Sequence, residues 1–415
     1  MIFDDEKPRE ACGIFGIYDH ADAAKLIYFG LYALQHRGQE SAGIAVARDQ
    51  SITTHKAMGL VSDVFNMDQL EQLGSGSAVG HVRYSTTGSS ILGNAQPFVV
   101  HHQKKIYAVA HNGNLVNAHN LKTELEEEGS IFQTTMDSEV FLHLLVKNFK
   151  HGFKRALVNA TSRLKGAFSI VLLTGKGEVV GIKDPNGFRP LCLGKLNGSY
   201  VLASESCALD LIEAAFIREL DPGEIVIISS DGIESIKPPV AADRTFCIFE
   251  FIYFARPDST IFGKNVYLTR KAHGRRLAEE ASVDADIVMP FPDSGTSAAL
   301  GFAEVSGIPF ETAMIRNHYV GRTFIQPTQS MRDFGVRVKL NPIKEVLKGK
   351  DVIIIEDSII RGTTARIRVK ALRELGVKRV HLRVSGPPHR YPCHYGIDFS
   401  TSGELIAANK TLAEL

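Results

Sequence analysis

Tryptophan is absent from the sequence, cysteine occurs only five times, and no apolar run approaches the length of a membrane span. Five scattered cysteines without a C-x-x-C pair argue against a disulfide framework and indicate a reducing compartment, so we expect a cytoplasmic protein. Neither sign of charge is in excess, because 47 Lys and Arg face 46 Asp and Glu. This balance gives no global field that would attract nucleic acid or a membrane surface. The acidic N-terminal segment also lacks the apolar core of a secretory signal.

The most informative stretch covers residues 352–364, VIIIEDSIIRGTT. Its β-branched run predicts a strand buried on both faces, and a helical pattern follows at residues 365–375. Glu356 and Asp357 stand where the strand ends, which in open α/β sheets is the edge where ligands bind. A Gly/Thr turn before a helix suits a phosphate, and an acid pair suits sugar hydroxyls or a hydrated Mg²⁺. An ordinary buried strand with a polar turn would explain the apolar run but not the acid pair and the Gly/Thr turn together.

This stretch resembles the phosphoribosyl pyrophosphate (PRPP) signature of type I phosphoribosyltransferases. The resemblance implies a parallel-sheet domain in which the acid pair and the turn hold the ligand. The PRPP-binding residues that it implies here are Glu356, Asp357, Ser358, Arg361, Gly362, Thr363 and Thr364.

A second strand, turn and helix precede this stretch, with the strand expected at residues 287–289 and the helix at 298–306. The small polar turn between them would cradle a pyrophosphate through backbone N–H groups, although many helices start in this way. Paired with the acid pair, the turn becomes a specific signal. The resemblance implies that Ser294 joins Glu356 and Asp357 at a Mg²⁺. The turn residues implied in PRPP binding are Asp293, Ser294, Gly295, Thr296 and Ser297.

Residues 317–348 form a long basic segment between these two turns. The segment is too long for a plain connection in a compact domain, so we expect a lid over the pyrophosphate, to which Arg322 and Lys339 would contribute. A solvated surface loop is the alternative interpretation.

The first half of the chain, residues 12–235, alternates strand-like and helix-like segments with many glycine turns. Strand runs outnumber helices, which predicts antiparallel sheets covered by helices rather than a doubly wound sheet. Residues 244–253 predict a strand that crosses to the second half, where the pattern from residue 271 predicts a parallel sheet. In the first half we expect strands at 13–17, 43–47, 79–84, 106–110, 168–173 and 224–228, and helices at 23–35, 117–128, 138–150 and 207–215.

Polar motifs interrupt the first half at HRGQESAG (36–43), HVRYST (81–86), HNGNL (111–115) and MDSE (136–139). Taken singly, Cys12 would be a small core residue, and Arg83 and Asp137 would be members of surface ion pairs. Together the motifs supply a thiol, a guanidinium, an amide beside a glycine N–H, and a carboxylate. In order and content they resemble the class II glutamine amidotransferases, which use an N-terminal nucleophile.

That resemblance implies a role for each polar group. If residues 1–11 are removed, Cys12 carries an α-amino group with a pKa near ~8, which can act as the base for its own thiol. Asn112 and the Gly113 N–H fit the oxyanion of a thioester-forming step. Arg83 would clamp the α-carboxylate of glutamine, and Asp137 would receive its α-ammonium group. Thr86 is implied as a further glutamine-binding residue.

With FARPDS (254–259) and the segment 317–341 added, the chain resembles the amidophosphoribosyltransferase family from Cys12 to Leu415. The resemblance implies a propeptide at 1–11, an αββα four-layer N-terminal-nucleophile glutaminase domain at 12–235, and a type I phosphoribosyltransferase domain at 236–415. It also implies transfer of ammonia from glutamine to PRPP at the start of purine synthesis. Mg²⁺ as cofactor, purine nucleotides as feedback inhibitors and a homo-oligomer, either dimer or tetramer, complete the expectation.

Three features depart from the family pattern. Glu356 stands where the family often has Asp, and residues 289–292, MPFP, are bulkier than the usual Gly-Val-Pro. Family members with a short propeptide generally carry a [4Fe–4S] cluster on four cysteines, of which Cys247 and Cys393 match the first two. The second pair would lie beyond Leu415, so we expect a cluster only with a longer C-terminal tail. Cys192 and Cys207 lie in apolar runs, and we expect them to be structural.

Two other functions compete with this interpretation. Another class II amidotransferase, of the glucosamine-phosphate or asparagine synthetase type, would need a sugar-isomerase or nucleotide-activating domain, which EDSIIRGTT does not fit. A non-catalytic PRPP-sensing regulator would keep the PRPP turns but would not need the Cys12 set.

Overall fold

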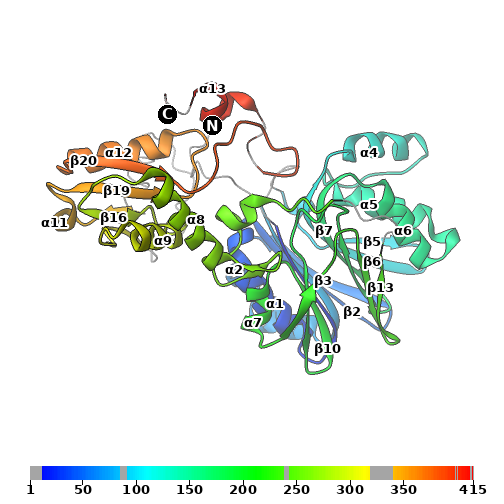
Figure 1. Cartoon of the computed structure of the whole chain (residues 1–415). Coiled ribbons are helices and arrows are strands. Elements are labelled where there is room, and N and C mark those ends of the chain that lie inside the picture. Colours follow the sequence, from blue (N-terminus) through cyan, green and yellow to red (C-terminus); the bar gives the residue numbers. More distant parts are fainter. Residues whose placement is uncertain are drawn as a thin grey trace.

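The computed structural model describes residues 12–84, 91–237, 243–317, 340–397, 399, 401–411 and 414. These residues form two halves that lie beside each other in Figure 1. Antiparallel sheets build the first half, and a parallel sheet builds the second. Both sheet types agree with the sequence prediction.

Two antiparallel sheets lie face to face in the first half (Figure 1). Strand alternation sorts their side chains, because Ile14 of β1 packs between the sheets while Phe15 and Ile17 face the helices outside. The seven-stranded sheet has the order β11 (Ala215–Glu219), β9 (Cys192–Leu196), β10 (Ser199–Ala203), β1 (Gly13–His20), β4 (Gly76–Arg83), β2 (Ser41–Arg48) and β3 (Ser51–Met58). The six-stranded sheet has the order β13 (Gly232–Ile236), β12 (Ile225–Ser229), β8 (Val179–Lys183), β7 (Gly166–Thr174), β6 (Lys105–Leu115) and β5 (Phe98–His102).

Helices cover the outer face of each sheet and complete four layers. The apolar faces of α1 (Ala23–Ala33), α2 (Val61–Val64), α3 (Met67–Leu73) and α7 (Ser206–Leu211) pack on the seven-stranded sheet. Those of α4 (Ala118–Glu127), α5 (Ser138–Lys147) and α6 (Phe153–Arg163) pack on the other. The expected αββα order is therefore confirmed. No helix within the described ranges has the length and apolar character that crossing a membrane would require.

A three-stranded parallel sheet, in the order β16 (Ile287–Pro290), β19 (Asp351–Glu356) and β20 (Arg379–Val384), organises the second half. The predicted strand at 352–355 is the centre of this sheet. Val352 and Ile354 enter one apolar cluster, and Ile353 and Ile355 enter another on the opposite face with α9 (Thr296–Ser306). Burial on both faces explains why the run is continuously apolar rather than alternating.

Shorter elements surround this sheet. The longer helices are α8 (Val266–Ala281) and α12 (Thr363–Glu374), which follows β19 as the sequence predicts. The remaining described elements of this half are η4 (Glu250–Phe254), β14 (Thr260–Ile261), β15 (Lys264–Asn265), β17 (Met314–Arg316), β18 (Leu340–Pro342), α11 (Lys344–Leu347), η5 (Ser402–Glu404) and α13 (Ile406–Asn409).

The strand predicted at residues 244–253 is wrong. This segment is irregular at first and then winds into the π-helical turn η4 (Glu250–Phe254). Phe249, Phe251 and Phe254 are all buried, in two different apolar clusters. A segment that is buried on several sides needs no regular alternation of apolar and polar residues. The imperfect alternation in this run therefore did not indicate a strand.

Close contact between α8 and α9 yields a first prediction. A Cβ at Gly274 would lie 1.8 Å from the Ala298 carbonyl oxygen, so Gly274→Ala must push the two helices apart. We expect a loss of about 1–3 kcal/mol in unfolding free energy, measured by denaturant titration. Gly403→Ala is the control, because nothing lies within 4 Å of a Cβ there. Equal stability of both variants would contradict the proposed close approach.

Candidate active sites

The candidate nucleophile lies at one end of the seven-stranded sheet. Cys12 directly precedes β1, whose first residue pairs with Val82 of β4, and Arg83 is the last residue of β4. The Cys12 thiol lies 3.6 Å from the Tyr84 carbonyl oxygen, and the residue is largely buried. Arg83 is also buried, with its guanidinium 3.9 Å from the Glu40 carboxylate. The fold thus brings the predicted thiol and guanidinium to the same strand ends.

Asn112 and Gly113 occupy the corresponding end of the other sheet, on β6. Asn112 is fully buried, and neither polar atom of its amide has a hydrogen-bond partner among the described residues. Buried amides are rarely left without a partner, so this side chain is available for a ligand. Gly113 has a φ of 140°, and a Cβ there would lie 1.9 Å from the Ala167 carbonyl oxygen. Only glycine fits this position.

A buried histidine joins the two strand ends. The His81 Nε2 atom, on β4, lies 3.0 Å from the His111 carbonyl oxygen on β6, one residue before Asn112. Burial lowers the pKa of His81 to about 3, so the ring is neutral at physiological pH. The contact holds the Arg83 strand against the Asn112 strand.

Asp137 lies beside this junction, immediately before α5. One oxygen accepts a hydrogen bond from the Leu115 N–H at 2.8 Å, and the other lies 3.4 Å from the His111 Nδ1 atom. Burial by itself raises the pKa of Asp137, but His111 and the backbone N–H groups outweigh it and keep the pKa below its usual range. Asp137 is therefore a fixed anion at neutral pH, as an ammonium partner must be.

The other cysteines lie away from this set. Cys192 and Cys207 are buried in the first apolar cluster, where burial raises the pKa of both thiols, so they are structural as expected. Cys247 and Cys393 pack together in an apolar cluster of the second half, and burial raises the pKa of Cys247 to about 11. Two thiols do not make the four-thiolate donor set of a [4Fe–4S] cluster, so the described residues do not fit that group.

The two predicted PRPP turns meet at the carboxyl ends of β16 and β19. The Phe291 N–H donates to the Ile355 carbonyl oxygen at 2.9 Å, and a Cβ at Gly295 would lie 2.4 Å from the same oxygen. α9 begins after Gly295 and α12 after Gly362, which has a φ of 80°. Neither glycine has a side chain to cap its helix, so each N-terminus suits an anion.

The acid pair is buried, and its two members are held differently. A Glu356 oxygen lies 3.1 Å from the Arg368 guanidinium of α12, whose plane lies over the Phe291 ring. The other Glu356 oxygen accepts from the Asp357 N–H at 3.3 Å. Asp357 accepts a 2.5 Å hydrogen bond from the Ser358 hydroxyl. The longer side chain of Glu356 thus reaches the Arg368 guanidinium of the following helix. The sequence analysis noted the extra methylene but did not predict this contact.

The remaining predicted residues divide into three groups. Ser294, Thr296 and Ser297 lie in or next to the first turn, and Thr363 and Thr364 begin α12. Two others are already engaged in ion pairs on the surface, Asp293 with Arg316 and Arg361 with Glu404. Thr86, Arg322, Lys339 and most of the expected lid lie outside the described residues, as does the expected propeptide.

Sequence reasoning missed a buried group of charges between the two halves. The Arg37 guanidinium contacts the Glu205 carboxylate of the first half and the Glu250 carboxylate of η4, and Arg189 also contacts Glu250. All four side chains are at most 1% exposed. A signal was present, because Glu250 interrupts the aromatic run CIFEFIYF, where a buried acid requires a partner.

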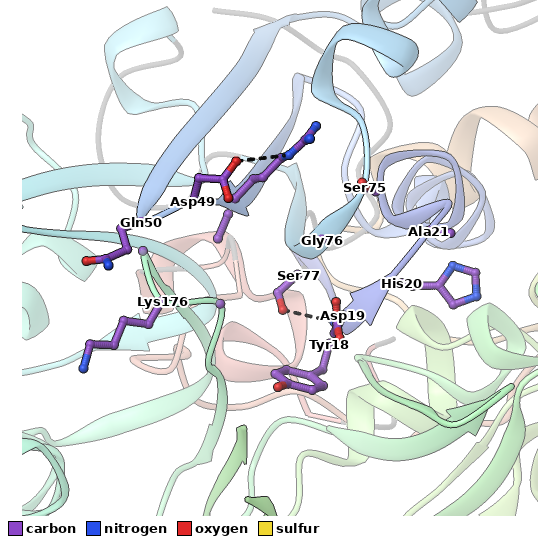
Figure 2. A pocket seen from close by; sticks show the side chains of 14 residues that line it. Tyr18, Asp19, His20, Ala21, Asp49, Gln50, Ser75, Gly76, Ser77 and Lys176 are labelled. Carbon is purple, nitrogen blue, oxygen red and sulfur yellow. Dashed lines mark hydrogen bonds and ion pairs between the residues drawn. The ribbon is translucent and has the colours of Figure 1, made fainter. Parts of the chain in front are cut away.

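A cavity of about 760 Å³ opens at the far end of the two sheets (Figure 2). The loops around Asp19, Asp49, Ser77 and Lys176 line it. Because β1 begins beside Cys12 and ends at this cavity, a strand length of roughly 25 Å separates the two. None of the residues that line the cavity belongs to either candidate site.

The chain matches several known proteins over almost its whole length. A family model described as "Glutamine amidotransferase domain" matches residues 81–211. The chain is 51% identical to an amidophosphoribosyltransferase of Synechocystis sp., with 99% of this chain and 84% of the relative covered. It is 49% identical to amidophosphoribosyltransferase 2, chloroplastic, of Arabidopsis thaliana, with 99% of this chain and 73% of the relative covered.

A solved structure is similar to this chain in both sequence and fold. The glutamine PRPP amidotransferase from Bacillus subtilis complexed with ADP and GMP is 47% identical to this chain, with a TM-score of 0.92. The alignment covers 97% of this chain and 88% of that one, and therefore includes both halves.

Gly113 provides a prediction for the first site. On the expected role of the Gly113 N–H at the oxyanion, Gly113→Ala should reduce glutamine hydrolysis at least ~100-fold, about 2.7 kcal/mol, because the new methyl group would collide with the Ala167 carbonyl group and displace that N–H. Gly198→Ala is the matched control, since its φ of 97° brings similar backbone strain while nothing lies within 4 Å of a Cβ. Glutamate release by each variant is the measurement. Similar rates for the two variants would remove Gly113 from the site.

Proposed function

This chain belongs to the amidophosphoribosyltransferase family, and on that premise we propose that the two residue sets described above divide the reaction between them. The enzyme transfers ammonia from glutamine to PRPP and forms 5-phosphoribosylamine, glutamate and pyrophosphate, the first committed step of purine biosynthesis. The observation that carries this function is the near-complete match to amidophosphoribosyltransferases over both halves. A non-catalytic PRPP-sensing regulator has no support among these relatives.

We propose a propeptide at residues 1–11, a glutaminase domain at 12–235 and a phosphoribosyltransferase domain at 236–415. Support comes from the apolar clusters, because three of them draw all their buried members from residues 14–228 and the other four from residues 249–405. Removal of the propeptide would give Cys12 the free amine that its thiol needs as a base.

In the glutaminase half, Cys12 attacks the side-chain amide carbon of glutamine. Asn112 and the Gly113 N–H stabilise the oxyanion, ammonia leaves, and water then hydrolyses the thioester to glutamate. The unpartnered amide of Asn112 supports this role. Arg83 holds the substrate α-carboxylate, Asp137 holds the α-ammonium group, and Thr86 contributes to the same pocket.

In the second half, ammonia attacks C1 of PRPP and pyrophosphate leaves. The turn at residues 293–297 and the turn at 358–364 hold the phosphate groups at the starts of α9 and α12. Arg322 and Lys339 add positive charge at the pyrophosphate. Asp357 holds the ribose as positive charge develops at C1, in a buried position where that interaction is strong.

We propose Mg²⁺ as the cofactor, near Ser294, Glu356 and Asp357. Three or more candidate metal-ligating side chains do not gather at any point of the described residues, so a dedicated protein cage does not fit. The acid pair does fit a Mg²⁺ that arrives with the pyrophosphate, since Mg²⁺ commonly keeps waters and binds one or two carboxylates plus substrate phosphates. When bound, the ion neutralises charge on the leaving pyrophosphate.

Regulation and assembly are proposals that extend the comparisons. The relative from Bacillus subtilis was solved with ADP and GMP, and we propose that purine nucleotides inhibit this enzyme by feedback. We also propose a homo-oligomer, either a dimer or a tetramer. All five cysteines are free, which fits a reducing compartment, and we place the enzyme in the cytoplasm.

Cys12→Ser tests the division of the reaction. Glutamine-dependent synthesis should fall at least ~1,000-fold, about 4 kcal/mol, while ammonia-dependent synthesis stays within about twofold of wild type. The reason is that the thiol and the PRPP turns lie in different halves. Cys393→Ser is the control and should retain both activities. The two rates are measured as phosphoribosylamine formed from PRPP with glutamine or with ammonium salt, and proportional loss of both would refute separate sites.

Asp357→Asn tests the second site. Both synthetic activities should fall more than ~100-fold with a native circular dichroism spectrum, because the variant keeps the shape but loses the charge at C1. Glu374→Gln removes an exposed carboxylate near the end of α12 and should have no effect. Ammonia-dependent synthesis within about tenfold of wild type, only about 1.4 kcal/mol, would exclude the proposed role of Asp357.

A further inference from the structure

Arg37 connects the candidate nucleophile to the second half of the chain. Its Nε atom donates to the Cys12 carbonyl oxygen at 3.1 Å, and its two terminal nitrogens donate to the two Glu250 oxygens at 2.9 and 2.8 Å. The side chains of Arg37 and Glu250 are completely buried. The bidentate pair with Glu250, together with the contact to Glu205, leaves Arg37 little freedom, so a shift of Glu250 would move the group that holds the Cys12 carbonyl.

The segment that carries Glu250 is anchored in the second half, while Arg189 of the first half also contacts the Glu250 carboxylate. Two residues of the same segment, Phe251 and Ala255, accept hydrogen bonds through their carbonyl oxygens from Arg270 of α8, at 2.6 and 2.8 Å. A second arginine, Arg189, contacts Glu250 at 3.2 Å and donates to the Tyr395 carbonyl oxygen at 3.0 Å. Glu250 therefore lies where α8 and the segment around Tyr395 meet the glutaminase half.

We propose that Glu250 is a positioning residue for glutamine hydrolysis, which acts through Arg37 on the main chain of Cys12. The proposal rests on the assignment of Cys12 as nucleophile. It makes the chemistry of the first half depend on a carboxylate that the second half supplies. Glu250 itself touches neither glutamine nor PRPP in this proposal.

The nucleophile of this class makes such control effective. When Cys12 is the first residue, the thiol and the α-amine that activates it are both attached to one Cα atom. Rotation about the bond between this Cα atom and the carbonyl carbon changes the position of the amine and of the side chain relative to Asn112 and Gly113. The Cys12 carbonyl group lies at the other end of that bond, so fixing the carbonyl group restricts the rotation. A displacement of about 1 Å at a reacting group can cost ~100-fold in rate, so a fixed carbonyl position is a kinetic requirement.

A purely structural ion pair exists in the same chain for comparison. Glu224 is also fully buried, and Arg218 donates to its two oxygens at 2.7 and 2.6 Å. Ser235 and the Asp221 N–H complete its contacts, all within the first half. Glu224→Gln therefore removes the same charge from a buried carboxylate in a bidentate pair without a connection to Cys12, although its partner Arg218 is 37% exposed.

The experiment compares Glu250→Gln with Glu224→Gln in the full-length processed enzyme. With PRPP present, Glu250→Gln should lower kcat for glutamine hydrolysis at least about tenfold with KM for glutamine within about threefold, because binding groups are untouched. Ammonia-dependent synthesis should stay within about twofold of wild type. Glu224→Gln should lower thermal stability but leave the ratio of the two activities unchanged.

Glu250→Asp provides a second variant if Glu250→Gln does not fold. It keeps the negative charge but is one methylene shorter, so it cannot keep the bidentate contact, and its kcat for glutamine should also fall about tenfold. A folded variant of either kind that hydrolyses glutamine at the wild-type rate would overturn the proposal. A proportional loss of both activities would overturn it as well. Failure of the nucleophile assignment is separable, because it would appear as glutamine hydrolysis retained in Cys12→Ser.

Discussion

A guanidinium that loses contact with water must be neutralised where it lies, and this requirement joins the two halves at Arg37. Burial alone would lower the pKa of Arg37, but Glu250 and Glu205 more than reverse the shift and keep the side chain charged. One of these carboxylates comes from each half. Separating the halves would leave the buried cation short of negative charge, and breaking a buried pair typically costs about 3–5 kcal/mol. The relative position of the halves is thus fixed beside Cys12.

Both candidate sites lie at strand ends, and packing explains why. Every side chain of β19 from Val352 to Ile355 is buried in an apolar cluster, so the strand has no position for a ligand until it ends at Glu356. The first five residues of β1 are likewise buried, and Cys12 lies directly before them. Turns with small residues then bring backbone N–H groups to these edges, and the flanking layers exclude water.

Local patterns predicted the sheet types, the family resemblance predicted the layer order, and the structure brings the described residues of each predicted polar set to one end of a sheet. The β-branched run at 352–355 predicts a buried strand. The motifs that contain Cys12 and Asn112 are short, and they follow one another along the chain in the order that the family resemblance implies. Several strands were not predicted. β3 has few buried residues and β11 is an exposed edge strand, so neither shows a clear alternation of apolar and polar residues. The strand prediction at residues 244–253 failed for the opposite reason, because a segment buried on several sides shows no regular alternation of apolar and polar residues.

Ion-pair partners that are distant in sequence could not be predicted, and the acid pair Glu356 and Asp357 is an example. The sequence analysis gave both carboxylates to the ribose or Mg²⁺, yet Arg368 and the Asp357 N–H engage the two oxygens of Glu356. Arg368 lies twelve residues further along the chain, and only the packing of α12 over Phe291 brings it back. The extra methylene of Glu356 is what lets its carboxylate reach that cation while its backbone stays at the strand end. Asp357 is shorter and follows the strand, and its carboxylate accepts from the adjacent Ser358 hydroxyl rather than from a cation of α12.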